Sequence, residues 1–152
     1  MSPEKKLKRT DSGDADFRQL IERLDHELWN ELNENQSTYD QFNKVPDLKT
    51  ALVGYAGEEP VACGCFKVIG SETIEIKRMF VAKIFRGQGW SKLVLGGLED
   101  WARELGYPKA VLETSIHFNT ARTLYKACGY QEIPNYGPYV GLPESVCMGK
   151  NL

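Results

Sequence analysis

A short loop with two glycines, between an apolar run and an amphipathic segment, constrains this chain more than any other feature. The apolar run ends at Val81, and the amphipathic segment begins at Leu93. Gly87 and Gly89 can adopt positive φ and place no side chain in the way of an anion. A glycine-rich turn that leaves a strand and opens a helix directs several backbone N–H groups to one point, where the helix dipole adds positive charge. The sequence therefore predicts a phosphate-binding turn in the segment Arg86-Gly87-Gln88-Gly89-Trp90-Ser91-Lys92.

A plain tight turn is the alternative, because a short motif match is only a hypothesis. Two other phosphate motifs fit poorly. A Walker A loop requires Gly-x-x-x-x-Gly-Lys-Ser/Thr, whereas Lys92 follows a serine and the glycines are too close together. A dinucleotide-binding fingerprint requires a third glycine or alanine and an acidic residue about 20 positions further on.

Composition limits the class of protein. The 152 residues are 41% hydrophobic and 26% charged, which suits one globular domain with a substantial core. A net charge of -2 gives no basic footprint, so nucleic acid is not an expected partner. The absence of an apolar run of about 20 residues and of a signal-peptide core predicts a cytoplasmic protein with no membrane partner. The four cysteines are expected to be reduced and buried, with no metal site.

Periodicity predicts the order of the elements. Residues 1–13 are polar and are predicted to be a disordered tail, and residues 14–152 a single domain. A helix is expected to begin after Asp14 or Asp16, and a second short helix to end before Pro46. Strands are predicted at 51–56 and 61–68 around a turn at 57–60, and at 73–81, 110–114 and 145–150. Helices are predicted from the glycine loop to Gly106 and over 119–127, so the fold class is α/β with a mixed sheet.

Two segments in the correct order resemble the GNAT superfamily of N-acetyltransferases. Residues 86–91 match the family pattern Gln/Arg-x-x-Gly-x-Gly/Ala except at its last position, where Ser91 stands. Residues 119–130 match Asn-x-x-Ala-x-x-Leu-Tyr-x-x-x-Gly-Phe/Tyr. The likeness extends from about Phe17 to Leu152 and implies a central, mostly antiparallel sheet flanked by helices.

A narrower resemblance is to bacterial members of this family. Residues 75–79, 112–114 and 133–139 reproduce their Glu-Ile-Lys-Arg-Met, Leu-Glu-Thr and Ile-Pro-x-Tyr-Gly-x-Tyr segments. Ser115 stands where glycine is usual, which affects the expected contacts of the acceptor rather than the fold.

The resemblance implies that acetyl-CoA is the cofactor. Its pyrophosphate is expected on the glycine loop, and its pantetheine arm on the strand that precedes the loop. The cofactor-binding residues implied in this way are Met79, Phe80, Val81, Arg86, Gly87, Gln88, Gly89, Trp90, Ser91, Lys92, Asn119 and Tyr125.

Two residues are implied as catalytic. Glu75 stands where some family members keep a general base, and Glu113 is its rival for that role. Glu75 could instead form an ion pair with Lys77 or Arg78, or bind the amine. Tyr125 stands where the family places a phenol that donates a proton to the leaving thiolate, with a core tyrosine as the alternative. Asn119 is expected to cap its helix and touch the cofactor, and His117 to lie at the surface.

The expected function is transfer of an acetyl group from acetyl-CoA to a primary amine, most simply of a small molecule. Acetylation of a protein lysine or N-terminus, or a non-catalytic acyl-CoA sensor, is the alternative. Longer acyl groups and a homodimer, which is common in the family, remain open. Candidate acceptor-binding residues, several of which could equally be core, are Trp29, Tyr39, Phe42, Glu113 and Tyr136.

Overall fold

A computed structural model describes residues 4–32 and 48–152, without the side chains of residues 29–32. The strands are hydrogen-bonded in the order β1-β2-β3-β4-β5-β7-β6, which confirms the predicted mixed α/β fold. The chain forms two compact units: an N-terminal unit of Met1–Phe66 and Arg78–Leu98, and a C-terminal unit of Lys67–Lys77 and Glu99–Leu152. The predicted short helix before Pro46 lies outside the described residues.

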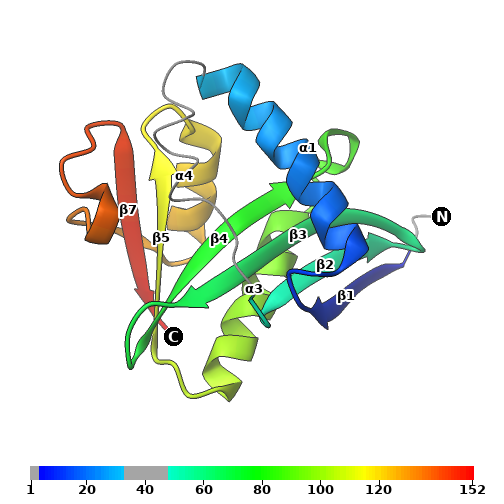
Figure 1. Cartoon of the computed structure of the whole chain (residues 1–152), viewed down its shortest axis with the longest axis horizontal. Helices are drawn as coiled ribbons and strands as arrows, with labels where there is room; N and C mark the ends of the chain where they lie inside the picture. The colour runs from blue at the N-terminus through cyan, green and yellow to red at the C-terminus, as the bar shows by residue number, and fades with distance from the viewer. Residues whose placement is uncertain (1–3, 33–47) are drawn as a thin grey trace. The chain divides into compact units, whose positions relative to one another are not determined.

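Three antiparallel strands form the sheet of the N-terminal unit: β1 (Lys5–Thr10), β2 (Ala51–Ala56) and β3 (Glu59–Val68). A turn at Gly57, which has φ 62°, joins β2 to β3 as predicted. The register between these two strands shifts at Gly54 and Tyr55. Figure 1 shows the three strands side by side.

The predicted disorder of residues 1–13 is wrong for Lys5–Thr10. These residues form β1, which pairs with β2 from Lys5 opposite Ala56 to Thr10 opposite Ala51. Backbone hydrogen bonds hold this edge strand, and its side chains are almost all exposed, so no apolar alternation marks it in the sequence. Lysines on an edge strand also discourage pairing with another chain.

Helix α1 (Ala15–Leu32) covers one face of these strands (Figure 1). Asp14 caps it as predicted, because its Oδ1 accepts the N–H groups of Asp16 at 2.9 Å and Phe17 at 3.1 Å. The buried residues of this core are Phe17, Leu20, Ala51, Val53, Cys63, Cys65, Phe80 and Ala82.

The first turns of α3 (Trp90–Glu104) contact the same strands through two glycines. A Cβ at Gly54 would lie 2.9 Å from the Trp90 ring, and one at Gly64 would lie 2.9 Å from Leu98. Because real Cβ atoms do not approach so closely, glycine at both positions lets the helix approach the strands.

The C-terminal unit is organised around β5 (Lys109–Ser115), which pairs in parallel with the first part of β4 (Thr73–Val81). On its other edge, β5 is antiparallel to β7 (Ser145–Asn151), which also pairs with β6 (Gln131–Ile133). Helix α4 (Asn119–Ala127) spans the range predicted for it. The short helices η2 (Lys83–Phe85) and η3 (Gly137–Tyr139) complete the described elements.

All four cysteines are free thiols. Cys63, Cys65 and Cys147 are buried as predicted, whereas Cys128 is only partly buried, contrary to the prediction. In residues 4–32 and 48–152, no helix is long and apolar enough to cross a membrane.

Candidate functional site

The glycine loop lies in the N-terminal unit, between η2 and the start of α3. Gly87 and Gly89 have φ of 78° and 85°, so both adopt the backbone that only glycine accepts easily. The Gly89 carbonyl accepts the N–H of Leu93 at 3.1 Å, which closes the first turn of the helix. The first N–H groups of any helix lack partners within it, and they are the donors that an anion-binding position uses. A Cβ at Gly87 would meet no atom of residues 4–32 or 48–152 within 4 Å, so the described part of the chain leaves the space at Gly87 open.

Arg86 has partners within the protein. Its Nε donates to the Val81 carbonyl at 2.9 Å, and its Nη2 contacts both carboxylate oxygens of Glu27, at 2.7 and 2.8 Å. A bidentate pair of this kind is geometrically specific. The expectation that Arg86 binds the cofactor therefore stays a prediction, and the guanidinium would have to share or leave Glu27 to reach a phosphate.

Two other expected cofactor residues use their side chains for packing. Trp90 is 2% exposed against Gly54, and Phe80 is 6% exposed in the core beneath α1. These two side chains are therefore largely buried, which leaves mainly the backbone for a ligand at the loop. Ser91 and Lys92 belong to the first turn of α3, and the Lys92 side chain is exposed.

Arg78 interrupts the regular backbone of β4. Its φ of 59° is uncommon for a residue that is not glycine, and in a strand it marks local strain. The guanidinium pairs with Asp25 of α1. Met79, Phe80 and Val81, the residues expected to meet the pantetheine arm, follow it directly. Sequence reasoning missed this distortion, because arginine carries no signal for positive φ.

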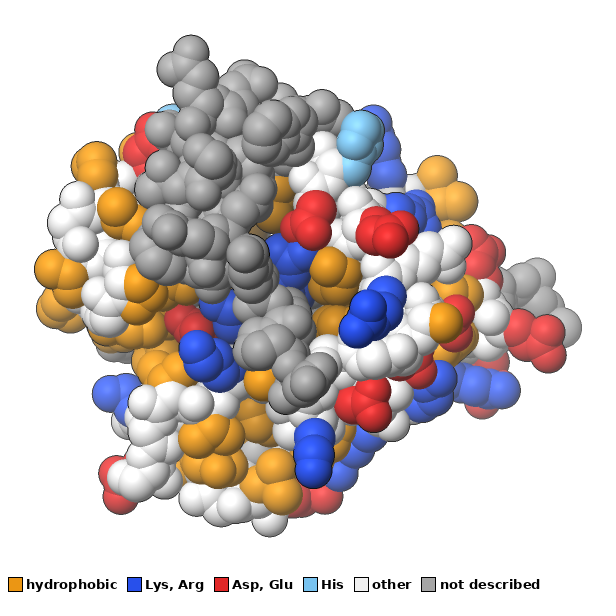
Figure 2. All heavy atoms as spheres, in the orientation of Figure 1, with side chains coloured by type: hydrophobic (Ala, Val, Ile, Leu, Met, Phe, Trp, Pro, Cys, Tyr) orange, Lys and Arg blue, Asp and Glu red, His pale blue; other side chains and the backbone are white. Residues whose placement is uncertain are grey.

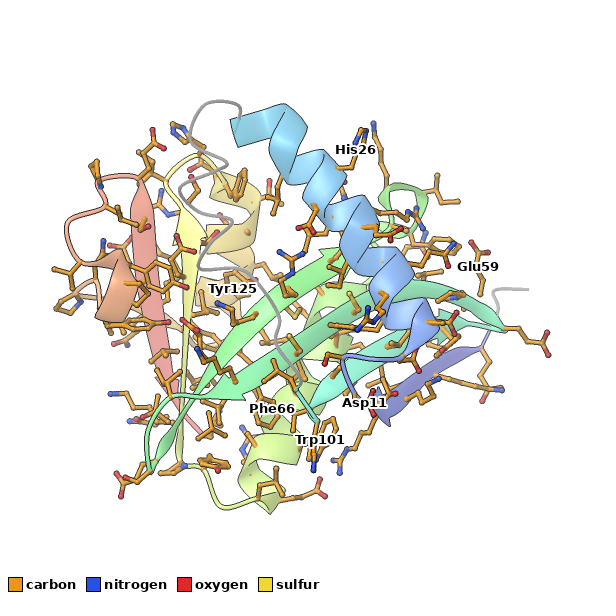
Figure 3. The ribbon with its side chains drawn as sticks, in the orientation of Figure 1. Asp11, His26, Glu59, Phe66, Trp101 and Tyr125 are labelled. Carbon is orange, nitrogen blue, oxygen red and sulfur yellow. The ribbon has the colours of Figure 1, made fainter. Side chains whose placement is uncertain are left out.

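A groove of about 400 Å³ runs beside α1 in the N-terminal unit. Figure 2 shows acidic and basic side chains intermixed over this helix around His26, which Figure 3 labels. Its lining residues are Glu22, Arg23, His26, Glu27, Phe80 and Lys83.

The C-terminal unit contains a group of buried polar side chains centred on Glu75, which we call the Glu75 cluster. Glu75 is 5% exposed, and its Oε1 lies 3.4 Å from Nζ of Lys77, which is 8% exposed. The Tyr136 hydroxyl donates to Glu75 Oε2, and Lys77 Nζ lies 3.4 Å from the Tyr139 hydroxyl. The ion pair that the sequence left as an alternative for Glu75 is therefore present.

Glu113 is the second carboxylate of this cluster. It is half-buried, and its Oε2 accepts the hydroxyl of Ser145 at 2.8 Å. Burial raises the pKa of Glu113 to about 7, the Ser145 hydrogen bond and the Lys77 charge oppose this rise, and the Glu75 charge adds to it. A group with this pKa changes protonation state near neutral pH.

The two tyrosines of the cluster remain protonated at neutral pH. Burial raises the pKa of Tyr136 and of Tyr139, and the nearby Glu75 charge adds to both shifts. Their rings meet edge to face, with centroids 5.5 Å apart.

Tyr125 projects from α4, where Figure 3 labels it. It is 8% exposed, and burial raises the pKa of its phenol to about 12. Its ring meets Tyr130 edge to face at 6.0 Å. Tyr125 therefore holds its proton at neutral pH.

Asn119 does not cap α4 as expected. Phe118 occupies the cap position without a side-chain hydrogen bond, and Asn119 is the first helical residue. The Asn119 side chain accepts from Arg122 at 3.5 Å. His117 is exposed and lies 3.4 Å from Glu144, in agreement with the surface position expected for it.

The expected site residues are thus distributed between both units. Residues 79–92 belong to the N-terminal unit, and Glu75, Glu113, Asn119, Tyr125 and Tyr136 belong to the C-terminal unit. Trp29 lies on α1 without a described side chain, and Tyr39 and Phe42 lie outside the described residues. In the described part of the chain, no group of three or more His, Cys, Asp or Glu residues could hold a metal ion.

The seven-stranded mixed sheet, with the glycine turn before α3 and the buried tyrosine on α4, matches the fold of acyl-CoA N-acyltransferases. The model of the acetyltransferase (GNAT) family matches residues 15–130, and the chain belongs to this family.

Related proteins support the same class. A protein of Azospirillum brasilense named IAA acetyltransferase is 32% identical over 137 residues, which are 88% of this chain and 89% of that protein. A crystal structure from Klebsiella pneumoniae, described as an acyl-CoA N-acyltransferase, is 30% identical with a TM-score of 0.78 and covers 100% of this chain and 98% of its own. The coenzyme A complex of PaiA N-acetyltransferase from Thermoplasma acidophilum shares the fold at 12% identity, with a TM-score of 0.69 over 98% of this chain and 99% of that one.

Proposed function

We propose that this chain transfers an acetyl group from acetyl-CoA to a primary amine, and that the acceptor is a small cationic molecule. One observation carries the cofactor assignment. Gly87 and Gly89 both have positive φ directly before the first turn of α3, within the region that the family model matches. Backbone of this kind favours an anion such as a pyrophosphate.

The residues present fit this cofactor. Residues 86–92 would hold the pyrophosphate through backbone N–H groups, and the backbone of Met79 and Val81 would hold the pantetheine arm. The open space over Gly87 supports this assignment. When bound, acetyl-CoA supplies an acetyl thioester as the donor.

The acceptor amine must lose a proton before or during its attack on the acetyl carbon, because an ammonium has no free electron pair. Glu113 suits the role of proton acceptor better than Glu75. Its pKa of about 7 matches the operating range of a general base, and its side chain is only half-buried. Both oxygens of Glu75 are already occupied, by Lys77 and Tyr136. Glu75 then serves to hold Lys77 and to raise the pKa of Glu113.

Tyr125 is assigned to the leaving thiolate. A phenol with a pKa of about 12 is protonated at neutral pH and can donate a hydrogen bond to a developing negative charge. The C–N bond forms and the C–S bond breaks. An acceptor that arrives as an ammonium loses two protons, the first to Glu113 before attack and the second after the C–N bond has formed. One proton protonates the departing thiolate, which Tyr125 stabilises by a hydrogen bond, and the other passes to solvent.

The charge of the Glu75 cluster supports a cationic acceptor. Among the described residues of the cluster, Glu75 and Glu113 place two carboxylates near the Lys77 ammonium. An amine that arrives protonated is attracted by an excess of carboxylates, and it can pass its proton to Glu113.

A thiol-release screen tests the proposal. The purified chain is given acetyl-CoA with amino acids, polyamines, aminoglycosides and peptides, and free coenzyme A is measured. We expect turnover with at least one small amine and less with peptides. Preference for peptides would identify a protein acetyltransferase, and coenzyme A binding without turnover of any amine would identify a sensor.

The same assay separates the two glutamates. Glu113→Gln should slow turnover by roughly 10² near pH 7 and remove the acidic limb of the kcat/KM profile, because glutamine cannot accept the proton. Glu75→Gln should keep an acidic limb and shift it to lower pH, because its charge raises the pKa of Glu113. The opposite pattern would assign the base to Glu75.

A further inference from the structure

Lys5, in the segment predicted to be disordered, reaches the glycine loop. Its Nζ donates a hydrogen bond to the carbonyl of Gln88, 83 positions later in the chain. The same ammonium lies 5.0 Å from the centre of the Trp90 ring and 4.0 Å from where a Cβ of Gly89 would be. One side chain of β1 therefore contacts Gln88 and Trp90 and lies beside Gly89 between them.

The alternation of β1 explains this position. A Cβ at Gly97 of α3 would lie 3.0 Å from Leu7, so Leu7 faces that helix, and Lys5 lies on the same face two residues earlier. Lys8 faces the other way, toward Asp14 at 2.8 Å. Lys5 pairs with Ala56, the last residue of β2, and this pairing determines the position of the ammonium along the strand.

The bond to Gln88 sets the direction of one donor of the loop. The Gln88 carbonyl and the Gly89 N–H belong to the same planar trans peptide, so they point in opposite directions. When Lys5 holds the carbonyl, the Gly89 N–H is turned away from the lysine. Gly87 and Gly89, which flank Gln88, both have positive φ and allow many backbone conformations, so the loop by itself constrains this peptide weakly.

Lys5 also adds a cation to those of the loop itself, Arg86 and Lys92. Arg86 is bound to Glu27 and the Val81 carbonyl, whereas an ammonium has three donors and the Gln88 carbonyl uses one. A positive charge this close to the loop lies within the screening distance of about 8 Å at physiological salt, so it attracts an anion bound there.

We propose that Lys5 is a positioning residue for the pyrophosphate of coenzyme A, because it orients the Gln88–Gly89 peptide and adds positive charge beside it. This inference rests on the proposed function, since it concerns the same cofactor. It extends the phosphate site to a strand that lies outside the matched family region, which begins at residue 15.

Calorimetry with coenzyme A tests the role of Lys5. Lys5→Met keeps most of the side-chain length and the contact with Trp90 but removes the ammonium. We expect Kd for coenzyme A to rise roughly tenfold, as for the loss of one charge-assisted hydrogen bond at an exposed site. Lys5→Arg should restore most of the affinity, because it keeps a charged donor. Lys6→Met is the matched control, since Lys6 is the neighbouring residue on the opposite face and is 59% exposed.

An acetyl donor without phosphate groups distinguishes a role of Lys5 at the pyrophosphate from a general effect on the fold. With an acceptor from the screen, Lys5→Met should raise KM for acetyl-CoA and leave kcat within about twofold, and it should not change kcat/KM for S-acetylpantetheine. Three results would overturn the inference. They are an equal Kd for coenzyme A in Lys5→Met and wild type, an equal loss of affinity in Lys6→Met, and an equal loss of kcat/KM with S-acetylpantetheine as the donor. A wild-type chain that does not bind coenzyme A would instead overturn the proposed function, and this inference with it.

Discussion

At the scale of single residues, the environment gives similar side chains different chemistry. Glu75 is fully buried and bound by Lys77 and Tyr136, whereas Glu113 is half-buried with a hydrogen bond from Ser145. The pKa of Glu113 rises to about 7 because burial outweighs that hydrogen bond. Neighbours distant in sequence thus bring the pKa of Glu113 close to neutral.

The raised pKa of Glu113 predicts a pH dependence of stability. The folded chain holds a proton on Glu113 up to about pH 7, and the unfolded chain releases it near 4.5. The stabilisation is therefore complete below about pH 4.5 and is lost as the pH rises to about 7. Urea unfolding of Glu113→Gln should show a smaller fall in free energy of unfolding over this range than wild type. Parallel curves for the two proteins would contradict the shift, and Glu58→Gln, at an exposed turn, is the control.

The phenol of Tyr125 predicts a loss in the chemical step without a loss of binding. A free thiol has a pKa of about 8.5, so complete proton transfer from a phenol near 12 would cost on the order of 5 kcal/mol. Tyr125 therefore acts through hydrogen-bond donation as the thiolate leaves. Tyr125→Phe should lower kcat by roughly 10² with Kd for coenzyme A unchanged, in single-turnover kinetics. Tyr130→Phe, which removes a bond to Glu99, is the control. Wild-type chemistry in Tyr125→Phe would leave Tyr125 a packing residue.

Contacts between distant residues could not be predicted from the sequence. The Arg86–Glu27 pair joins positions 59 apart, and the contact of Lys5 with Gln88 joins positions 83 apart. The conformations of Gly87 and Gly89 could be predicted, because they follow from the local need for positive φ.

At the scale of elements, helices and strands with a strong apolar periodicity could be predicted from the sequence. A strand that is held by backbone pairing alone could not. Strand β4 and helix α4 have the predicted bounds, since an alternating or 3.6-residue apolar pattern specifies each. Strand β1 was missed because β2 supplies its hydrogen bonds while its mostly polar side chains remain largely exposed. The cap of α4 was assigned to Asn119, one residue late, because Phe118 gives no capping signal.

The N-cap of α1 predicts a measurable contribution to stability. Asp14 accepts the N–H groups of Asp16 and Phe17, and its other oxygen lies 3.0 Å from the Thr10 hydroxyl. Asp14→Ala should lower the free energy of unfolding by about 1–2 kcal/mol in urea titration. Asp14→Asn should recover most of it, because an amide oxygen also caps a helix. Equal losses in both variants would mean that the charge, rather than the cap, stabilises the helix.

At the scale of the whole molecule, the fold class and the family could be predicted from two motifs in the right order, and the match over residues 15–130 confirms the family. What could not be predicted is the division into two compact units, each with part of the expected site. Strands β3 and β4 and helix α3 contribute to both units, so local patterns along the chain do not mark the boundary. The candidate acceptor residues Tyr39 and Phe42 remain predictions.

Coenzyme A binding by Gly89→Val tests the central claim most directly. A β-branched residue at φ 85° is strained, so the turn before α3 must change conformation and lose its converging N–H groups. Gly106→Val is the matched control. Gly106 has φ 91° and lies at the other end of the same helix. A Cβ added there, as at Gly87, would have no atom of the described residues within 4 Å. Calorimetry should show that the Gly106 variant binds coenzyme A as wild type does, while the Gly89 variant, still folded by circular dichroism, does not bind it. Wild-type affinity in folded Gly89→Val would contradict the assignment of the loop as the cofactor site.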